Sequence, residues 1–210
     1  MSGAHKGWNR REFTAGAALL ALALGIPAAG VKLTDLDAED LPSDRQRRLI
    51  AEVSDLVIPR TDTPGAMEVG VGDFVVLALA HGLGGTRTPM AAEMVTAATA
   101  PFRRRDGSLR YLPWLEHVLD RAAGGDFLRH SAAERTRLLT ALDDAAFAQG
   151  APPSPWNALK GLILTGYYTS EAGGSQELRY ELVPGKWEWD IPLTPEMRAF
   201  SSDWTAVDFG

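Results

Sequence analysis

The chain has 210 residues, 45% of them hydrophobic and 23% charged, which is typical of a globular protein with a sizeable core. Its net charge of −6 argues against a nucleic-acid-binding function, because neutralising phosphates requires a basic face and the only basic run is Arg103–Arg105. The absence of cysteine excludes disulfides, thiolate catalysis and cysteine-ligated metal or iron–sulfur sites.

The N-terminal segment, residues 1–30, has the pattern of an export signal. A positively charged start is followed by a short apolar run over residues 15–26. The paired Arg10 and Arg11, with Phe13 after a spacer, resemble a twin-arginine signal. This resemblance implies export to the periplasm. Whether the segment is cleaved or persists as a membrane anchor stays open, and a buried N-terminal helix is the alternative reading.

Residues 31–43 are acidic and lack periodicity, so we interpret them as a linker. A helical domain is expected over residues 44–172. Its first helix begins near Asp44 and carries apolar residues at helical spacing until Pro59 stops it.

Four more helices are expected from apolar periodicity and capping residues. They run from Asp73, as N-cap, to Gly82; from Met90 to Ala98; from Leu109 to Ala123; and from Ser131, in a capping box with Glu134, to about Ala148. A last helix begins at Pro155 with Ser154 as N-cap, and its pattern ends at Gly173-Gly174. No alternating strand pattern is present. The predicted fold class is therefore all-α, an irregular helical bundle.

Residues 173–210 are expected to form an extended, aromatic C-terminal tail. Pro184, Gly185 and Pro192 exclude a helix or a central strand. Trp187 and Trp189 lie in this tail, and tryptophan outside a helical stripe is enriched at interfaces. The tail is therefore predicted to pack on a partner; covering the chain's own core is the alternative.

Two blocks of sequence resemble a known family. One block consists of Gly166, Tyr167, Tyr168, Thr169, Ser170 and Glu171, followed by Gln176 to Tyr180 and Val183 to Lys186. The other block lies earlier in the chain and runs from Leu56 to Ala66, with Gly70-Val71 after it. Together they resemble the signature of the gluconate 2-dehydrogenase subunit 3 family, over roughly residues 45 to 193.

The resemblance implies a non-catalytic small subunit of an exported sugar or sugar-acid dehydrogenase. The partner would be a large flavoprotein of the glucose–methanol–choline type that carries FAD, with no cofactor in this chain. The small subunit would stabilise that partner and direct its twin-arginine export; a cytochrome c subunit, the sugar and any membrane association are left open. The expected partner interface consists of Tyr167, Tyr168, Glu171, Gln176, Arg179, Trp187 and Trp189.

No residues with a catalytic or metal-binding pattern stand out. The histidines have no paired-ligand spacing, and no dinucleotide or nucleophile-elbow motif is present. Glu171 and Glu177 flank the Gly-Gly turn and suggest, as an alternative function, a periplasmic saccharide-acting enzyme with a carboxylate pair. A third hypothesis is a membrane-tethered scaffold without a dehydrogenase partner.

Overall fold

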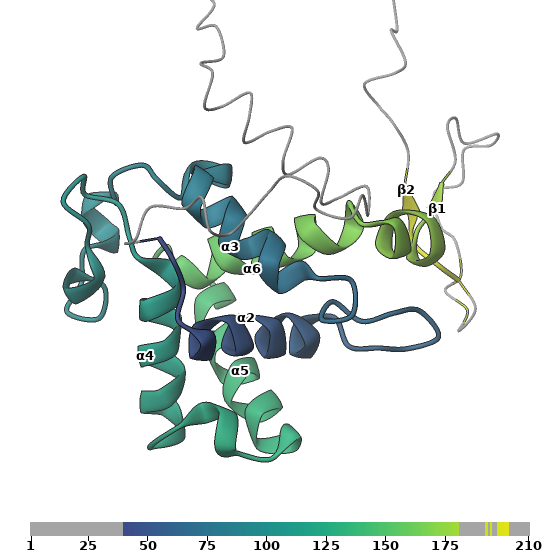
Figure 1. The fold of residues 1–210 in the computed structure, drawn as a ribbon, viewed down its shortest axis with the longest axis horizontal. Coiled ribbons are helices and arrows are strands. Elements are labelled where there is room, and N and C mark those ends of the chain that lie inside the picture. The colour runs from purple at the N-terminus through teal and green to yellow at the C-terminus, as the bar shows by residue number, and fades with distance from the viewer. Residues whose placement is uncertain (1–39, 181–191, 193, 195–196, 202–210) are drawn as a thin grey trace, which may run out of the picture.

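The computed structural model describes residues 40–180, 192, 194 and 197–201, and this part of the chain is helical (Figure 1). The all-α prediction is confirmed. The α-helices are α2 (Asp44–Val57), α3 (Val71–His81), α4 (Tyr111–Ala123), α5 (Ala132–Phe147) and α6 (Pro155–Tyr168). Short 3-10 turns are η2 (Leu83–Gly85), η3 (Ala92–Met94), η4 (Ala100–Phe102) and η5 (Phe127–Arg129), and a π-helical turn, η6 (Gly173–Glu177), follows α6.

Local capping chemistry explains where several helices begin. The Ser43 hydroxyl accepts the Gln46 N–H, and the Gln46 side chain accepts the Ser43 N–H, so a capping box opens α2. Ser154 and Asn157 form the same reciprocal pair at α6, with Pro155 at the first helical position as predicted. Ser131 caps α5 as expected, although the Glu134 carboxylate bonds to Arg137 instead of returning to the cap.

Two of the predicted helices differ from the structure, one in where it begins and one in whether it forms. The second helix begins at Val71 and not at Asp73, because Gly70 adopts a left-handed conformation (φ 77°) that starts the turn two residues earlier. The helix predicted over residues 90–98 is absent, and one 3-10 turn, η3, takes its place. The Thr99 hydroxyl accepts the Thr96 N–H and donates to the Met94 carbonyl, so side-chain bonds compete with the helical pattern in a segment whose side chains are mostly exposed.

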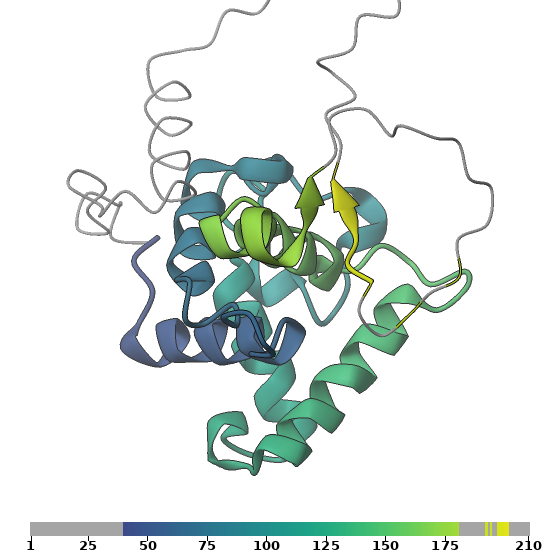
Figure 2. The same cartoon turned by 90° about the vertical axis from the view of Figure 1, so that its right-hand side faces the viewer.

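The core lies around α3, which is buried on most sides as its sequence predicts. α3 packs against α2 and α6, while α4 and α5 close the bundle on its other side (Figures 1 and 2). Gly166 allows the close approach of α6 to α3, since a Cβ at this position would lie 2.6 Å from the Phe74 ring. Trp156 is fully buried near the start of α6, and its indole N–H donates to Asp143.

The end of the last helix also differs from the prediction. α6 ends at Tyr168 with Thr169 as C-cap, five residues before Gly173. The chain then makes the π-helical turn η6, and Gly173 is buried in it. The glycines therefore serve close packing, described below, and not the left-handed helix stop that the sequence suggested.

After η6 the chain forms a very small sheet. β1 (Arg179–Tyr180) pairs in parallel with β2 (Phe200–Ser201), with Arg179 opposite Phe200. Of the predicted tail, Trp187 and Trp189 lie outside the described residues, as do residues 1–39 with the proposed signal and most of the linker. The proposed domain boundaries stay predictions. In the described part of the chain, every helix is too short or too polar to cross a bilayer.

Candidate interaction site

The two blocks of sequence singled out above meet in space at the end of α6. The Tyr167 hydroxyl donates to the Pro64 carbonyl at 2.9 Å and lies 3.5 Å from the Thr63 hydroxyl. Tyr167 is only 1% exposed, so this bond joins the first block to the second inside the molecule. The joined residues are more than 100 positions apart in the sequence.

Glu177 connects this pair to a third segment. The Thr63 hydroxyl donates to Glu177 Oε2 at 2.6 Å, and Arg198 Nη1 donates to the same oxygen at 3.2 Å. Arg198 also forms an ion pair with Asp62. We call these six residues the Tyr167 cluster: Asp62, Thr63, Pro64, Tyr167, Glu177 and Arg198.

Two glycines allow tight local turns of the backbone beside the cluster. A Cβ on Gly173 would lie 2.0 Å from the Tyr167 carbonyl oxygen, and a Cβ on Gly65 would lie 2.7 Å from both the Arg60 nitrogen and Asp55 Oδ1. The atoms in the way are largely backbone atoms, which cannot move aside easily. Each of these two segments therefore needs glycine in order to fold back closely on its own backbone.

Tyr168 is a partly exposed aromatic residue next to the Tyr167 cluster. Its side chain is 39% exposed, and its ring meets the Tyr167 ring edge-on at 5.3 Å between centroids. Partial burial, and then the neighbouring Glu177 and Tyr167, raise the pKa of Tyr168 above its ordinary value. The phenol therefore stays neutral at physiological pH and can both donate and accept a hydrogen bond.

The other predicted interface residues are placed differently. Glu171, Gln176 and Arg179 are exposed around η6, and Arg179 contributes its backbone to β1, where its N–H donates to the Ala199 carbonyl. Trp187, Trp189, Arg10, Arg11 and Phe13 lie outside the described residues. Sequence reasoning missed Thr63 and Arg198: Thr63 looked like an ordinary turn residue, and Arg198 carries no motif.

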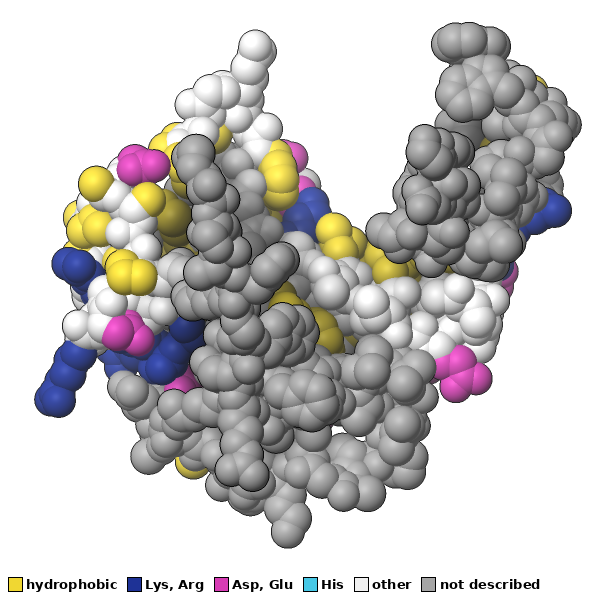
Figure 3. Space-filling view, turned by 90° about the horizontal axis from the view of Figure 1, so that it is seen from above, with side chains coloured by type: hydrophobic (Ala, Val, Ile, Leu, Met, Phe, Trp, Pro, Cys, Tyr) yellow, Lys and Arg dark blue, Asp and Glu magenta, His cyan; other side chains and the backbone are white. Residues whose placement is uncertain are grey.

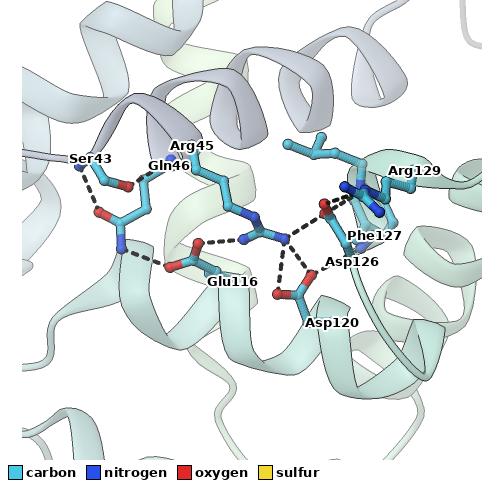
Figure 4. Close-up of polar contacts among 9 residues, drawn as sticks. Ser43, Arg45, Gln46, Glu116, Asp120, Asp126, Phe127 and Arg129 are labelled. Carbon is cyan, nitrogen blue, oxygen red and sulfur yellow. Dashed lines mark hydrogen bonds and ion pairs between the residues drawn. The ribbon is translucent and has the colours of Figure 1, made fainter.

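A second polar cluster holds the other end of the bundle together (Figure 4). Arg45 Nη2 donates to Asp120 and Asp126 at 2.7 Å each, and the Arg45 guanidinium also pairs with Glu116. Burial opposes the charge of Arg45, but its bonds to Asp126, Asp120 and Glu116 outweigh burial and raise its pKa. This cluster joins α2 to α4 and η5 by charges that satisfy one another, which indicates a structural role.

Within the described residues, no three His, Asp or Glu side chains are grouped so that they could hold a metal ion. Glu171 is exposed, whereas Glu177 is engaged by Thr63 and Arg198. The carboxylate that the saccharide-enzyme alternative needs is thus also a member of the Tyr167 cluster.

No match was found among the curated proteins or among the solved structures. A family model described as gluconate 2-dehydrogenase subunit 3 matches residues 44–185, which is more than half of the 210-residue chain and includes both blocks that meet at Tyr167. The chain belongs to the gluconate 2-dehydrogenase subunit 3 family.

Proposed function

We propose that the chain is the non-catalytic small subunit of an exported, FAD-dependent dehydrogenase of sugars or sugar acids. The observation that carries this proposal is the convergence of both family blocks on Tyr167, beside an exposed aromatic ring. The family membership supplies the class of assembly, a dehydrogenase complex with several subunits.

In this proposal the catalytic partner is a large flavoprotein of the glucose–methanol–choline type, and FAD resides there. A subunit that binds only the folded partner stabilises it by mass action. Arg10, Arg11 and Phe13 would direct the folded pair through twin-arginine export to the periplasm. The partner's active site would decide which sugar is oxidised, and a cytochrome subunit would accept the electrons where one is present.

The test is copurification of the tagged chain from its native host with the proposed flavoprotein. Tyr168→Ala removes an exposed ring at the Tyr167 cluster and is expected to raise the Kd by roughly tenfold or more, as truncating an aromatic anchor does. Trp187→Ala and Trp189→Ala are expected to weaken the pair in the same assay. Flavin absorbance of the eluate reports the partner directly.

Phe147→Ala is the matched control, because Phe147 is 56% exposed but lies at the end of α5, away from the cluster. An unchanged ratio of the two subunits with Tyr168→Ala would remove the docking assignment. A chain that elutes alone and colourless, and hydrolyses saccharides until Glu171→Gln abolishes the activity, would replace the proposal with the enzyme alternative.

A further inference from the structure

The connection between α3 and α4, residues 82–110, is basic in an acidic protein; we call it the α3–α4 loop. It contains five arginines, no lysine and only two acidic residues, Glu93 and Asp106, whereas the whole chain has a net charge of −6. Figure 1 places this loop at the left end of the bundle and places β1 and β2, which follow the Tyr167 cluster, at the right end. The loop is therefore remote from the docking surface proposed above.

Three of the five arginines carry charges that the described part of the chain does not neutralise. The other two, Arg87 and Arg104, pair with the carboxylate of Asp40 at 2.8 and 2.5 Å, and the Asp40 side chain is only 5% exposed. The three that remain are exposed, and none of them forms an ion pair with another described residue: Arg103, Arg105 and Arg110. These three positive charges are therefore available to a partner.

The rest of the loop presents an uncharged surface. Residues 88–101 contain one charged residue, Glu93, in 14 positions, where the 23% charge of the whole chain would place about three. Most of their side chains are exposed, and Val95 is 41% exposed. An ordered, exposed stretch with so little charge has the character of an interaction surface.

The positive charge lies directly beside this uncharged stretch. A Cβ on Gly107 would lie 3.1 Å from the Pro89 Cβ and 3.3 Å from Arg103 Nη2, so the Arg103 guanidinium is close to Pro89. The Met90 N–H donates to the Gly107 carbonyl at 2.9 Å and ties the two segments together. Figure 3 shows hydrophobic side chains together with lysine and arginine side chains at this end of the molecule.

The loop is held in one shape without a partner. Thr99 is 4% exposed, and its hydroxyl accepts the Thr96 N–H and donates to the Met94 carbonyl. The Phe102 ring lies 5.4 Å from the ring of His117 on α4, measured between centroids. A surface that is already folded loses little conformational entropy when it binds.

The composition of the loop indicates the kind of partner. Protein interfaces are depleted of charge at their centre and enriched in methionine and in arginine over lysine, which describes this loop. Segments that lie on a bilayer use exposed aromatic anchors, whereas the one aromatic residue of the loop, Phe102, is half-buried against His117. Three unneutralised arginines call for carboxylates on the other side.

We propose that the α3–α4 loop is a second docking surface, which binds an acidic surface on another subunit of the same complex. Carboxylates of that subunit pair with Arg103, Arg105 and Arg110, and the uncharged stretch around Val95 forms the centre of the contact. This inference rests on the proposed function, since it requires an assembly of several subunits.

The test is carbodiimide cross-linking in the complex purified through the tagged chain from its native host. The reagent joins an amine to a carboxylate in contact with it, and the chain has no lysine between residues 33 and 159. Arg105→Lys keeps the positive charge and introduces an amine into the loop. We expect this amine to couple to an aspartate or glutamate of a copurifying subunit, which mass spectrometry identifies.

Two matched substitutions control for position. Arg48→Lys and Arg121→Lys introduce the same amine at exposed positions on α2 and at the end of α4, and neither should give a cross-link to that subunit. A product of equal yield from all three positions would overturn the proposal, because it would show contact without a preferred surface.

Charge reversal tests whether the contact is electrostatic. Adding Arg103→Glu and Arg110→Glu to the Arg105→Lys chain is expected to lower the cross-link yield about tenfold, because like charges then face each other. Adding Arg48→Glu and Arg121→Glu to the Arg105→Lys chain makes the same charge change away from the loop and should leave the yield unchanged. Circular dichroism of each chain checks that it is folded.

The outcomes separate this inference from the function on which it rests. A complex that copurifies with flavin but gives no cross-link from Arg105→Lys would overturn the docking surface and leave the proposed function intact. A chain that elutes alone and colourless would remove both. Loop-dependent flotation with phosphatidylglycerol vesicles, without a cross-link to a subunit, would overturn the proposal by showing that the loop binds anionic lipid instead.

Discussion

Single residues decide how tightly the backbone can fold back on itself beside the family blocks, and Gly173 is the most constrained of them. The 2.0 Å that would separate its Cβ from the Tyr167 carbonyl oxygen is the shortest such distance among the described glycines. Gly161 is a useful contrast on α6, because a Cβ there would meet nothing within 4 Å. Gly173 therefore has no room for a side chain, whereas Gly161, a dozen residues earlier, does.

We expect Gly173→Ala to lower the free energy of unfolding by about 3 kcal/mol, since a methyl group forced against backbone must displace η6. Gly161→Ala should raise it by about 1 kcal/mol, because alanine favours an exposed helical position. Urea unfolding followed by circular dichroism measures both values. Equal effects of the two substitutions would show that the close approach at Tyr167 does not constrain Gly173.

Residue chemistry could be predicted from the sequence where it is local. Ser131 and Ser154 cap their helices through bonds to residues two or three positions away, which the sequence makes visible. The bond from Tyr167 to Pro64 depends on how the helices pack, and no spacing rule reaches across that separation. The sequence could therefore identify the blocks but not the contact that unites them.

Among the elements, α2 and α4 are joined by the carboxylates around Arg45. The hydrogen bond from Arg45 is the main cause that lowers the pKa of Asp126 below its ordinary value of 3.8. A carboxylate with a depressed folded-state pKa contributes stability that is present above its unfolded pKa. That stability is lost as the pH falls through the folded pKa.

Arg45→Met should therefore change the pH dependence of stability. The unaltered chain is expected to lose stability as the pH falls below about 5 and on through the lowered folded-state pKa of Asp126, because this carboxylate then protonates. The variant should be less stable at neutral pH, because Glu116, Asp120 and Asp126 then repel one another, and should lose less on acidification. Thermal unfolding at several pH values tests this, with Arg48→Met on the same helix as control; parallel curves for all three chains would contradict it.

The boundaries of elements were harder to predict than their existence. Asp73 resembles an N-cap, but Gly70 starts α3 earlier by adopting a conformation that glycine reaches at little cost. Residues 90–98 have helix-forming alanines and methionine, yet most of their side chains are exposed, so no tertiary contact stabilises a helix there. In both places backbone freedom or missing burial decided the outcome, and sequence periodicity reports neither.

For the molecule as a whole, β1 and β2 hold the C-terminal segment against the family blocks. A chain that stops after residue 196 loses β2 and both ion pairs of Arg198, whereas one that stops after residue 201 keeps them. We expect the shorter chain to be about 1 kcal/mol less stable, because Arg198 and its partners are partly exposed to solvent. Chemical denaturation of the two truncated chains measures the difference, and equal stability would show that this closure contributes nothing.

The bond between Tyr167 and Pro64 also bears on the order of events while the chain is being synthesised. The two residues are 103 positions apart, and ribosomes add about 5–20 residues per second, so Pro64 waits roughly 5–20 s for its partner to be synthesised. The N-terminal segment is made earlier still. During that interval the beginning of the chain is available to cellular factors while the domain behind it has no closed core.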